Sequence, residues 1–227
     1  MPKRNPLINL ALNLILSKYL GEQPRKSTDQ VPELGDVPVI KGLRSKDGAV
    51  ILVLGRRESG KTILSQRLAE VIGRPVYAVS PEEKPPPWIT ELKLEQLNEE
   101  PPPYSTLVLD DLPVYASQRD YNSAYVQILE KLIPVCRHKR KLILIFSAQS
   151  SGLSDRWVMD SDVIFLKPAN LLFLETERPS VAKFYRTVMP LFDKMSEAQQ
   201  KRHCYLLSQA CREMVRIDLP HTTLPGG

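Results

Sequence analysis

Short apolar runs alternate with longer helical patterns from residue 49 onward. The runs are rich in Val, Ile and Leu and are apolar at consecutive positions, which predicts strands that are buried on both faces. The segments between them are long enough for helices, so the alternation predicts parallel strands joined by crossover helices. The five expected strands are 49–54, 75–80, 106–111, 141–149 and 162–167.

Helical periodicity marks three other segments. Between the third and fourth strands, apolar residues recur at helical spacing, namely Tyr121, Ala124, Tyr125, Ile128, Leu129, Leu132 and Ile133. A short helical pattern at 89–98 lies between two triproline segments, which predict stiff extended connectors. A last helix is expected at 195–217, where Ser196 and Gln199 have the spacing of a capping box. Its apolar face would contain Cys204, Leu207, Cys211 and Met214.

The two ends of the chain are predicted to extend a single core. The first twenty residues form an amphipathic pattern with a narrow polar stripe, and Lys18 ends it before it could span a bilayer. We expect a packing helix there, with docking on a membrane or partner as the alternative. Residues 21–47 are polar and contain Pro and Gly, which predicts a linker. The expected division is an N-terminal helix and linker at 1–47, a core at 48–190, and a C-terminal helix and tail at 191–227.

Composition fits one soluble α/β domain. The 227 residues are 42% hydrophobic and 25% charged, which argues against global disorder. The net charge of +5 is compatible with a polyanionic partner but does not identify one. Cys136, Cys204 and Cys211 form no CxxC pair and have no histidines at ligand spacing. The sequence therefore predicts neither a disulfide framework nor a metal cluster, and a reducing compartment is expected.

The stretch "GRRESGKT", residues 55–62, directly follows the first expected strand and has the spacing of a phosphate-binding loop. Gly55 and Gly60 would allow positive φ and close approach to phosphates. Lys61 would place its charge against the β and γ phosphates, and Thr62 would offer a hydroxyl to Mg²⁺. The expected nucleotide-binding residues are Gly55, Arg56, Arg57, Glu58, Ser59, Gly60, Lys61, Thr62 and Ile63.

Polar residues close the third and fourth strands. Asp110 and Asp111 end the third strand, at the carboxyl edge where open α/β sheets bind ligands. We expect Asp110 to hold Mg²⁺ through a water molecule and Asp111 to polarise the attacking water. Gln149 ends the fourth strand and is predicted to sense the γ-phosphate, with Ser147 as a weaker candidate.

The order of these features predicts the fold class. A separate strand, 75–80, fits between the phosphate loop and the acidic pair, as in the ATPase branch of phosphate-loop proteins. An NKxD guanine reader and a clear arginine-rich lid are both absent, which disfavours GTPases and small-molecule kinases. We therefore predict an α/β P-loop NTPase of the ASCE/RecA-like type. Its mostly parallel central sheet would be flanked by helices in a three-layer sandwich, with ATP and Mg²⁺ as cofactors.

A basic cluster, "RHKRK" at 137–141, stands at the other end of the fourth strand. At about 3.3 Å per residue, Arg137 and Arg140 would lie roughly 25–35 Å from their own nucleotide edge. We therefore predict that one of them acts in trans on the nucleotide of a neighbouring subunit. A solvated basic turn and contact with a DNA backbone are the alternatives.

The motifs together resemble the FtsK/HerA superfamily, and within it the compact genome-packaging ATPases of double-stranded DNA viruses with internal membranes. The resemblance covers about 49–168 and rests on "GRRESGKT", "TLVLDD", "RHKRKLILIFSAQ" and "SDRWVMDSDVIFLKP". In that family an arginine precedes the fourth strand, a glutamine closes it, and another arginine precedes the fifth strand. These positions are Arg137, Gln149 and Arg156. The chain departs from the family at Asp111, where glutamate is common, and in its unusually basic loop.

The resemblance implies an ATPase that drives double-stranded DNA into a preformed viral capsid. It further implies a homo-oligomeric ring, a pentamer or hexamer, at the capsid vertex, in the host cytoplasm and the virion. One alternative is a non-viral DNA translocase of the same superfamily, which usually has additional domains. Another is an ATP-switch assembly protein like the filamentous-phage morphogenesis proteins, which are expected to carry a transmembrane segment. Membrane contact has no support in the sequence.

Overall fold

The computed structural model describes residues 31–79, 84–98, 101–110, 131–149, 160–169, 174–175, 177 and 179–218. The predicted N-terminal helix and most of the predicted helix at 121–133 lie outside these residues, although residues 131–135 are helical. None of the described helices is long and apolar enough to cross a bilayer.

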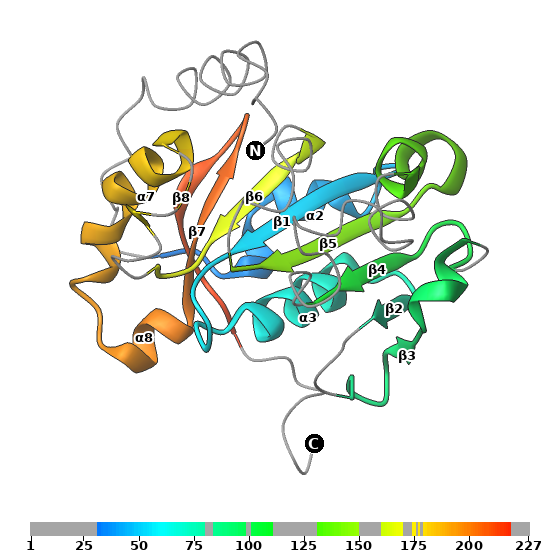
Figure 1. Cartoon of the computed structure of the whole chain (residues 1–227), viewed down its shortest axis with the longest axis horizontal. Coiled ribbons are helices and arrows are strands. Elements are labelled where there is room, and N and C mark those ends of the chain that lie inside the picture. The colour runs from blue at the N-terminus through cyan, green and yellow to red at the C-terminus, as the bar shows by residue number, and fades with distance from the viewer. Residues whose placement is uncertain are drawn as a thin grey trace, which may run out of the picture.

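A mixed, mostly parallel sheet forms the centre of the described chain (Figure 1). Its strand order is β3-β2-β4-β5-β1-β6-β7-β8. The strands β1 to β6 pair in parallel, and β7 and β8 add an antiparallel edge. Their bounds are β1 Ala49–Leu54, β2 Val76–Val79, β3 Thr90–Glu91, β4 Thr106–Leu109, β5 Ile143–Ala148, β6 Val163–Leu166, β7 His203–Ser208 and β8 Arg212–Arg216. The five strands expected from the apolar runs are confirmed.

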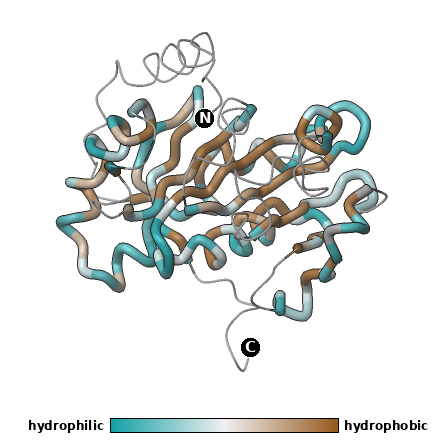
Figure 2. Tube along the Cα trace, in the orientation of Figure 1, coloured by the Kyte–Doolittle hydropathy of each residue, from teal (hydrophilic) through white to brown (hydrophobic). Residues whose placement is uncertain are grey.

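Helical segments cover both faces of the sheet. Successive residues of β1 belong to two different apolar clusters, because neighbouring side chains of a strand point to opposite faces. One cluster contains residues of α2 and α3, and the other contains residues of α7, which gives three layers. Figure 2 shows the apolar residues concentrated along the central strands. The helical segments are η1 Leu34–Asp36, α2 Pro38–Leu43, α3 Lys61–Ile72, η2 Leu94–Asn98, η4 Cys136–Arg140, α7 Pro179–Phe192 and α8 Glu197–Lys201.

The predicted linker at 21–47 is wrong over its described part. Residues 34–43 form η1 and α2, and four of their side chains are at most 1% exposed: Leu34, Val37, Ile40 and Leu43. These side chains pack in the same cluster as α3. Pro38 does not interrupt the helix because it lies in the first turn, where its missing N–H has no helical partner. The segment is therefore part of the core.

The predicted helix at 195–217 is also corrected. Its capping box is confirmed, because Ser196 Oγ accepts from Gln199 N and Gln199 Oε1 accepts from Ser196 N at 2.9 Å. The helix α8 ends at Lys201, however, and the chain continues as the β7–β8 hairpin. Cys204 and Leu207 therefore lie in different clusters and not on one helical face. The physical reason is the unbroken apolar run at 204–207, which is buried on both faces as a strand.

The helical pattern at 89–98 is replaced by a short strand and a 3₁₀ turn. Residues of β3 pair with β2, and Leu92 N donates to Ala78 O at 2.8 Å. The segment η2 follows as a single short 3₁₀ helix. Pairing with an open sheet edge satisfies backbone groups that so short a helix would leave without partners.

Candidate nucleotide-binding site

The loop between β1 and α3 has the backbone that its glycines suggest. Gly60 has φ 88° and ψ 29°, a left-handed conformation that disfavours residues with a Cβ atom. Glu58 also has a positive φ, 60°, which sequence reasoning did not foresee. Leu64 N then donates to Gly60 O at 3.1 Å and closes the first turn of α3. The loop therefore turns sharply into the amino end of a twelve-residue helix, where backbone amides and the helix dipole favour an anion.

Gly55 is needed for space. A Cβ atom on it would lie 2.5 Å from Lys167 Cβ and 2.9 Å from Ser59 Oγ. Its amide donates to Ala148 O at 3.2 Å, and Arg56 N donates to Pro168 O at 2.9 Å. These bonds fasten the start of the loop to the ends of β5 and β6. The sequence interpretation gave both glycines positive φ, but of the two only Gly60 has it.

Lys61 lies folded into the loop. Its side chain is only 8% exposed. Its Nζ donates to Arg56 O at 3.0 Å, a carbonyl of the loop itself. The ammonium is thus held within the curve of the loop, where a phosphate group could take over the hydrogen bond.

Three polar side chains from separate segments meet beside Lys61. Thr62 Oγ1 donates to Asp110 Oδ2 at 2.7 Å, and Ser147 Oγ donates to Asp110 Oδ1. Asp110 is 8% exposed and directly follows β4. The contact exists because β5 lies between β1 and β4, so that the carboxyl ends of all three strands are adjacent. We call Thr62, Asp110 and Ser147 the carboxylate cluster.

The donor set fits Mg²⁺. A carboxylate and a hydroxyl are the hard oxygen ligands that Mg²⁺ prefers, together with water and phosphate oxygens. In the loop, Ser59 Oγ is buried without a hydrogen-bond partner among the described residues. A buried hydroxyl without a partner at this position is available to hydrogen-bond a bound group. Both observations favour a bound metal–phosphate group at this edge of the sheet.

The other predicted residues are distributed as follows. Gln149 is half-buried and follows β5 at the same edge as the loop. Arg56 is half-buried, and Arg57, Glu58 and Ile63 are exposed. Asp111 and Arg156 lie outside the described residues.

The sequence interpretation missed two residues near the loop. Lys84 lines a small cavity of about 20 Å³ together with Thr62, Gln66 and Asp110. Lys167 follows β6 and lies beneath the loop. A lysine placed shortly after a buried strand is a signal that could have drawn attention to both positions, since carboxyl strand ends form the ligand edge of such sheets.

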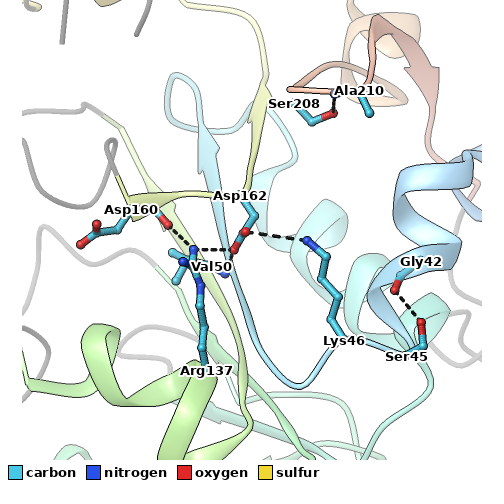
Figure 3. Close-up of polar contacts among 9 residues, drawn as sticks. All are labelled: Gly42, Ser45, Lys46, Val50, Arg137, Asp160, Asp162, Ser208 and Ala210. Carbon is cyan, nitrogen blue, oxygen red and sulfur yellow. Dashed lines mark hydrogen bonds and ion pairs between the residues drawn. The ribbon is translucent and has the colours of Figure 1, made fainter. Parts of the chain in front are cut away.

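Arg137 follows the start of η4 and lies near the amino ends of β1 and β6, at the other end of the strands from the loop. Figure 3 shows its contacts. Its Nη2 donates to Asp162 Oδ2 at 2.8 Å and to Asp160 O at 2.9 Å. Asp162 Oδ2 also accepts from Val50 N at 2.8 Å, and Asp162 Oδ1 lies 3.7 Å from Lys46 Nζ. These partners surround the amino ends of β1 and β6. A polar pocket of about 400 Å³ adjoins them.

Cations from three segments gather at this edge. The Arg74 guanidinium donates to Lys141 O and Arg44 O, each at 3.2 Å, and to Lys46 O. It therefore joins the end of α2, the turn after α3 and the turn before β5. Arg140 Nη2 donates to Pro101 O at 2.9 Å. We call the following set the basic edge: Arg44, Lys46, Arg74, Arg137, His138, Lys139, Arg140 and Lys141.

No family model and no curated protein matches the chain in sequence. Solved structures do match. The genome packaging NTPase B204 of Sulfolobus turreted icosahedral virus 2, in complex with ATP-gammaS, has 13% identity and a TM-score of 0.52, covering 76% of this chain and 99% of that one. The DNA-packaging ATPase B204 of Sulfolobus Turreted Icosahedral Virus has 11% identity and a TM-score of 0.51, covering 76% and 98%.

A secretion protein matches equally well in fold. The cytoplasmic domain of the type VII secretion ATPase EccC of Thermomonospora curvata has 10% identity and a TM-score of 0.52, covering 79% of this chain and 26% of that one. At these identities the likeness establishes the fold alone. The predicted P-loop ATPase architecture is confirmed, and the fold by itself assigns no substrate or partner.

The crowding at Gly55 gives a matched pair of glycine variants. We expect Gly55→Ala to lower the free energy of unfolding by about 1–3 kcal/mol, because the added methyl overlaps Lys167. Gly42→Ala, in α2 with nothing within 4 Å of the added methyl, should raise it by about 0.5–1 kcal/mol. Urea unfolding of both variants measures the difference. Equal stabilities would contradict the close packing beneath the loop.

Proposed function

We propose that this protein is an ATPase that binds ATP with Mg²⁺ at the phosphate loop. The observation that carries the proposal is the carboxylate cluster beside Lys61, where Asp110 accepts hydrogen bonds from both Thr62 and Ser147. Thr62 would hold the metal directly and Asp110 through a water molecule. When bound, Mg²⁺ neutralises charge that develops on the phosphate oxygens.

Other residues of the chain would bind the phosphates and activate the attacking water. Lys61 exchanges its bond to Arg56 O for the β and γ phosphates, and the loop amides from Gly55 to Gly60 surround them. Ser147 fixes the orientation of the Asp110 carboxylate. Asp111, the next residue along the chain, orients the attacking water and accepts its proton. Gln149, at the end of β5, contacts the γ-phosphate and the water.

Substitutions separate nucleotide binding from hydrolysis. Lys61→Ala should weaken binding of ATP, because it removes the charge inside the loop. Asp111→Asn should leave binding near the parent level and lower the hydrolysis rate by about 10²–10⁴-fold, since the amide cannot accept a proton. Phosphate release and titration with a non-hydrolysable analogue measure the two effects. Asp36→Asn, at an exposed carboxylate far from the loop in sequence, is the matched control. If Asp111→Asn hydrolyses ATP at the parent rate, the role of Asp111 in activating the attacking water is wrong.

We further propose that hydrolysis drives double-stranded DNA into a viral capsid. Two observations support this proposal. The fold is similar to that of the B204 packaging NTPase over 99% of that protein. The basic edge gathers cations from three segments, and such a surface can bind the phosphate backbone of DNA. The non-viral translocase and the ATP-switch assembly protein remain the competing functions.

Duplex DNA distinguishes these functions. We expect duplex DNA to stimulate the ATPase. It should bind more weakly to Lys139→Ala, and the slope of log binding constant against log salt concentration should fall in magnitude by about 1, because one phosphate contact is lost. Lys183→Ala, at an exposed lysine of α7, should behave like the parent. The measurements are ATPase rates with and without DNA and DNA affinity across a salt series. Identical ATPase rates with and without DNA would favour the ATP switch.

The subunits are proposed to form a ring, a pentamer or hexamer, at the capsid vertex in the host cytoplasm and the virion. The position of Arg137 supports this arrangement, because it lies at the edge opposite its own loop. A neighbouring nucleotide would replace Asp162 as its partner. Arg140 is the alternative arginine, and Arg156 is a further one.

Mixed assemblies test the trans arginine. Lys61→Ala and Arg137→Ala subunits should each be inactive alone. Their mixture should regain part of the ATPase activity, because an intact loop can then face an intact arginine. The control is each variant alone, taken through the same mixing procedure at the same total concentration. If the mixture stays inactive while each variant still assembles, the trans role of Arg137 is wrong.

A further inference from the structure

Lys167 is a fully buried lysine beneath the phosphate loop. Its exposed fraction is 0%, and its backbone N donates to Leu54 O at 2.7 Å, next to the start of the loop. Its Cβ lies 2.5 Å from the place of a Cβ on Gly55, and its Nζ lies 3.6 Å from the place of a Cβ on Gly60. The side chain therefore runs under the loop from its first glycine to its last.

The ammonium of Lys167 is held by main-chain carbonyls. Its Nζ donates to Gln200 O at 3.0 Å, Lys201 O at 2.8 Å and His203 O at 2.7 Å. These carbonyls belong to the end of α8 and the start of β7, which we call the α8–β7 junction. No described carboxylate pairs with Lys167. A Cβ on Gly60 would lie 3.1 Å from Lys201 O, so the junction also contacts the loop directly.

This arrangement costs free energy that an apolar side chain would avoid. Removing an ammonium from water without a carboxylate partner is unfavourable, and carbonyl dipoles offset only part of the cost. Burial is the largest influence on Lys167 and lowers its pKa. Cys204 opposes that change, and repulsion from the ammonium of Lys61 adds to it, so that the pKa of Lys167 is lowered to about 8. A bound polyphosphate would supply the missing negative charge. Only the loop backbone, and not bulk water, would lie between it and Lys167, so the attraction would be weakly screened.

We infer that Lys167 is a positioning cation of the nucleotide site, which supports bound phosphate from behind the loop and couples loop occupancy to the α8–β7 junction. The inference rests on the proposed nucleotide binding. It assigns the C-terminal elements a role in sensing the nucleotide.

The charge of Lys167 makes nucleotide affinity depend on pH in a definite direction. A bound anion favours the charged form of Lys167, so the pKa of Lys167 rises on binding and protons are taken up near pH 8. Affinity should therefore fall as pH rises above 8. The titratable groups that face Lys167 are Lys61 and the buried Cys204 thiol, whose pKa is raised to about 12 by burial. Among the junction side chains, Lys201 pairs with Glu197, and His203 Nδ1 lies 2.7 Å from Gln199 O.

Calorimetry tests the inference on the parent protein. A non-hydrolysable ATP analogue with Mg²⁺ is titrated at pH 7, 8 and 9, in buffers that differ in ionisation enthalpy. We expect proton uptake at pH 8 and an affinity that falls by up to about tenfold between pH 8 and 9. This window lies above the second ionisation of phosphate, near pH 6. Binding should also slow amide hydrogen exchange at residues 200–204.

Variants assign the effect to one side chain. Lys167→Met keeps the length without the charge and should bind about tenfold or more weakly at pH 7, with no proton uptake. Lys167→Arg keeps a permanent charge and should bind tightly, also without proton uptake. Lys194→Met, at an exposed lysine before α8, is the matched control and should keep the parent profile.

The outcomes separate this inference from the proposed function. If the parent binds the analogue without proton uptake and without slower exchange at the junction, the role of Lys167 is wrong and nucleotide binding stands. If Lys167→Met keeps the parent affinity and pH profile, the inference is also overturned. If the parent binds no nucleotide at all, both proposals fail. Because two readouts use the parent alone, they decide the question even if Lys167→Met does not fold.

Discussion

The candidate site depends on the position of β5 between β1 and β4. Parallel pairing places Leu54 opposite Ala148, and Leu109 opposite Phe146, so the three carboxyl ends are level to within two residues. In this order Ser147 of β5 reaches Asp110 from one side, and Thr62, in the first turn of α3 after β1, reaches the same carboxylate from the other. If β1 and β4 were direct neighbours, no residue of β5 would stand between the loop and the carboxylate.

The same strand separates two kinds of chemistry. Its carboxyl end belongs to the loop, where backbone amides, a helix amino end and buried side chains favour a compact polyphosphate. Its amino end follows η4 and lies beside the arginine and lysine side chains of the basic edge. The hydrogen bonds of Arg74 to three carbonyls keep the basic segments together although their charges repel. The strand β5, which runs from one edge to the other, is buried along its whole length.

Much of the fold could be predicted because its signals are local. Consecutive apolar residues identify each buried strand, and "GRRESGKT" identifies the loop from glycine and lysine spacing alone. Predictions failed where tertiary contacts decide. The segment at 34–43 resembles a linker until Ile40 is seen packed against α3, and 203–208 becomes a strand because β6 offers an edge. Lys167 had no motif, since its importance comes from burial beneath a loop more than a hundred residues earlier in the chain.

The opposite placement of the loop and Arg137 has a consequence for symmetry. A contact that joins the loop edge of one subunit to the basic edge of the next uses two different surfaces, so it is heterologous. An open row of such subunits always has a free loop edge at one end and a free basic edge at the other. Such a contact either closes on itself after a fixed rotation or continues as an open filament. Closure would therefore depend on the relative orientation of the loop edge and the basic edge, which lie at opposite ends of the same strands.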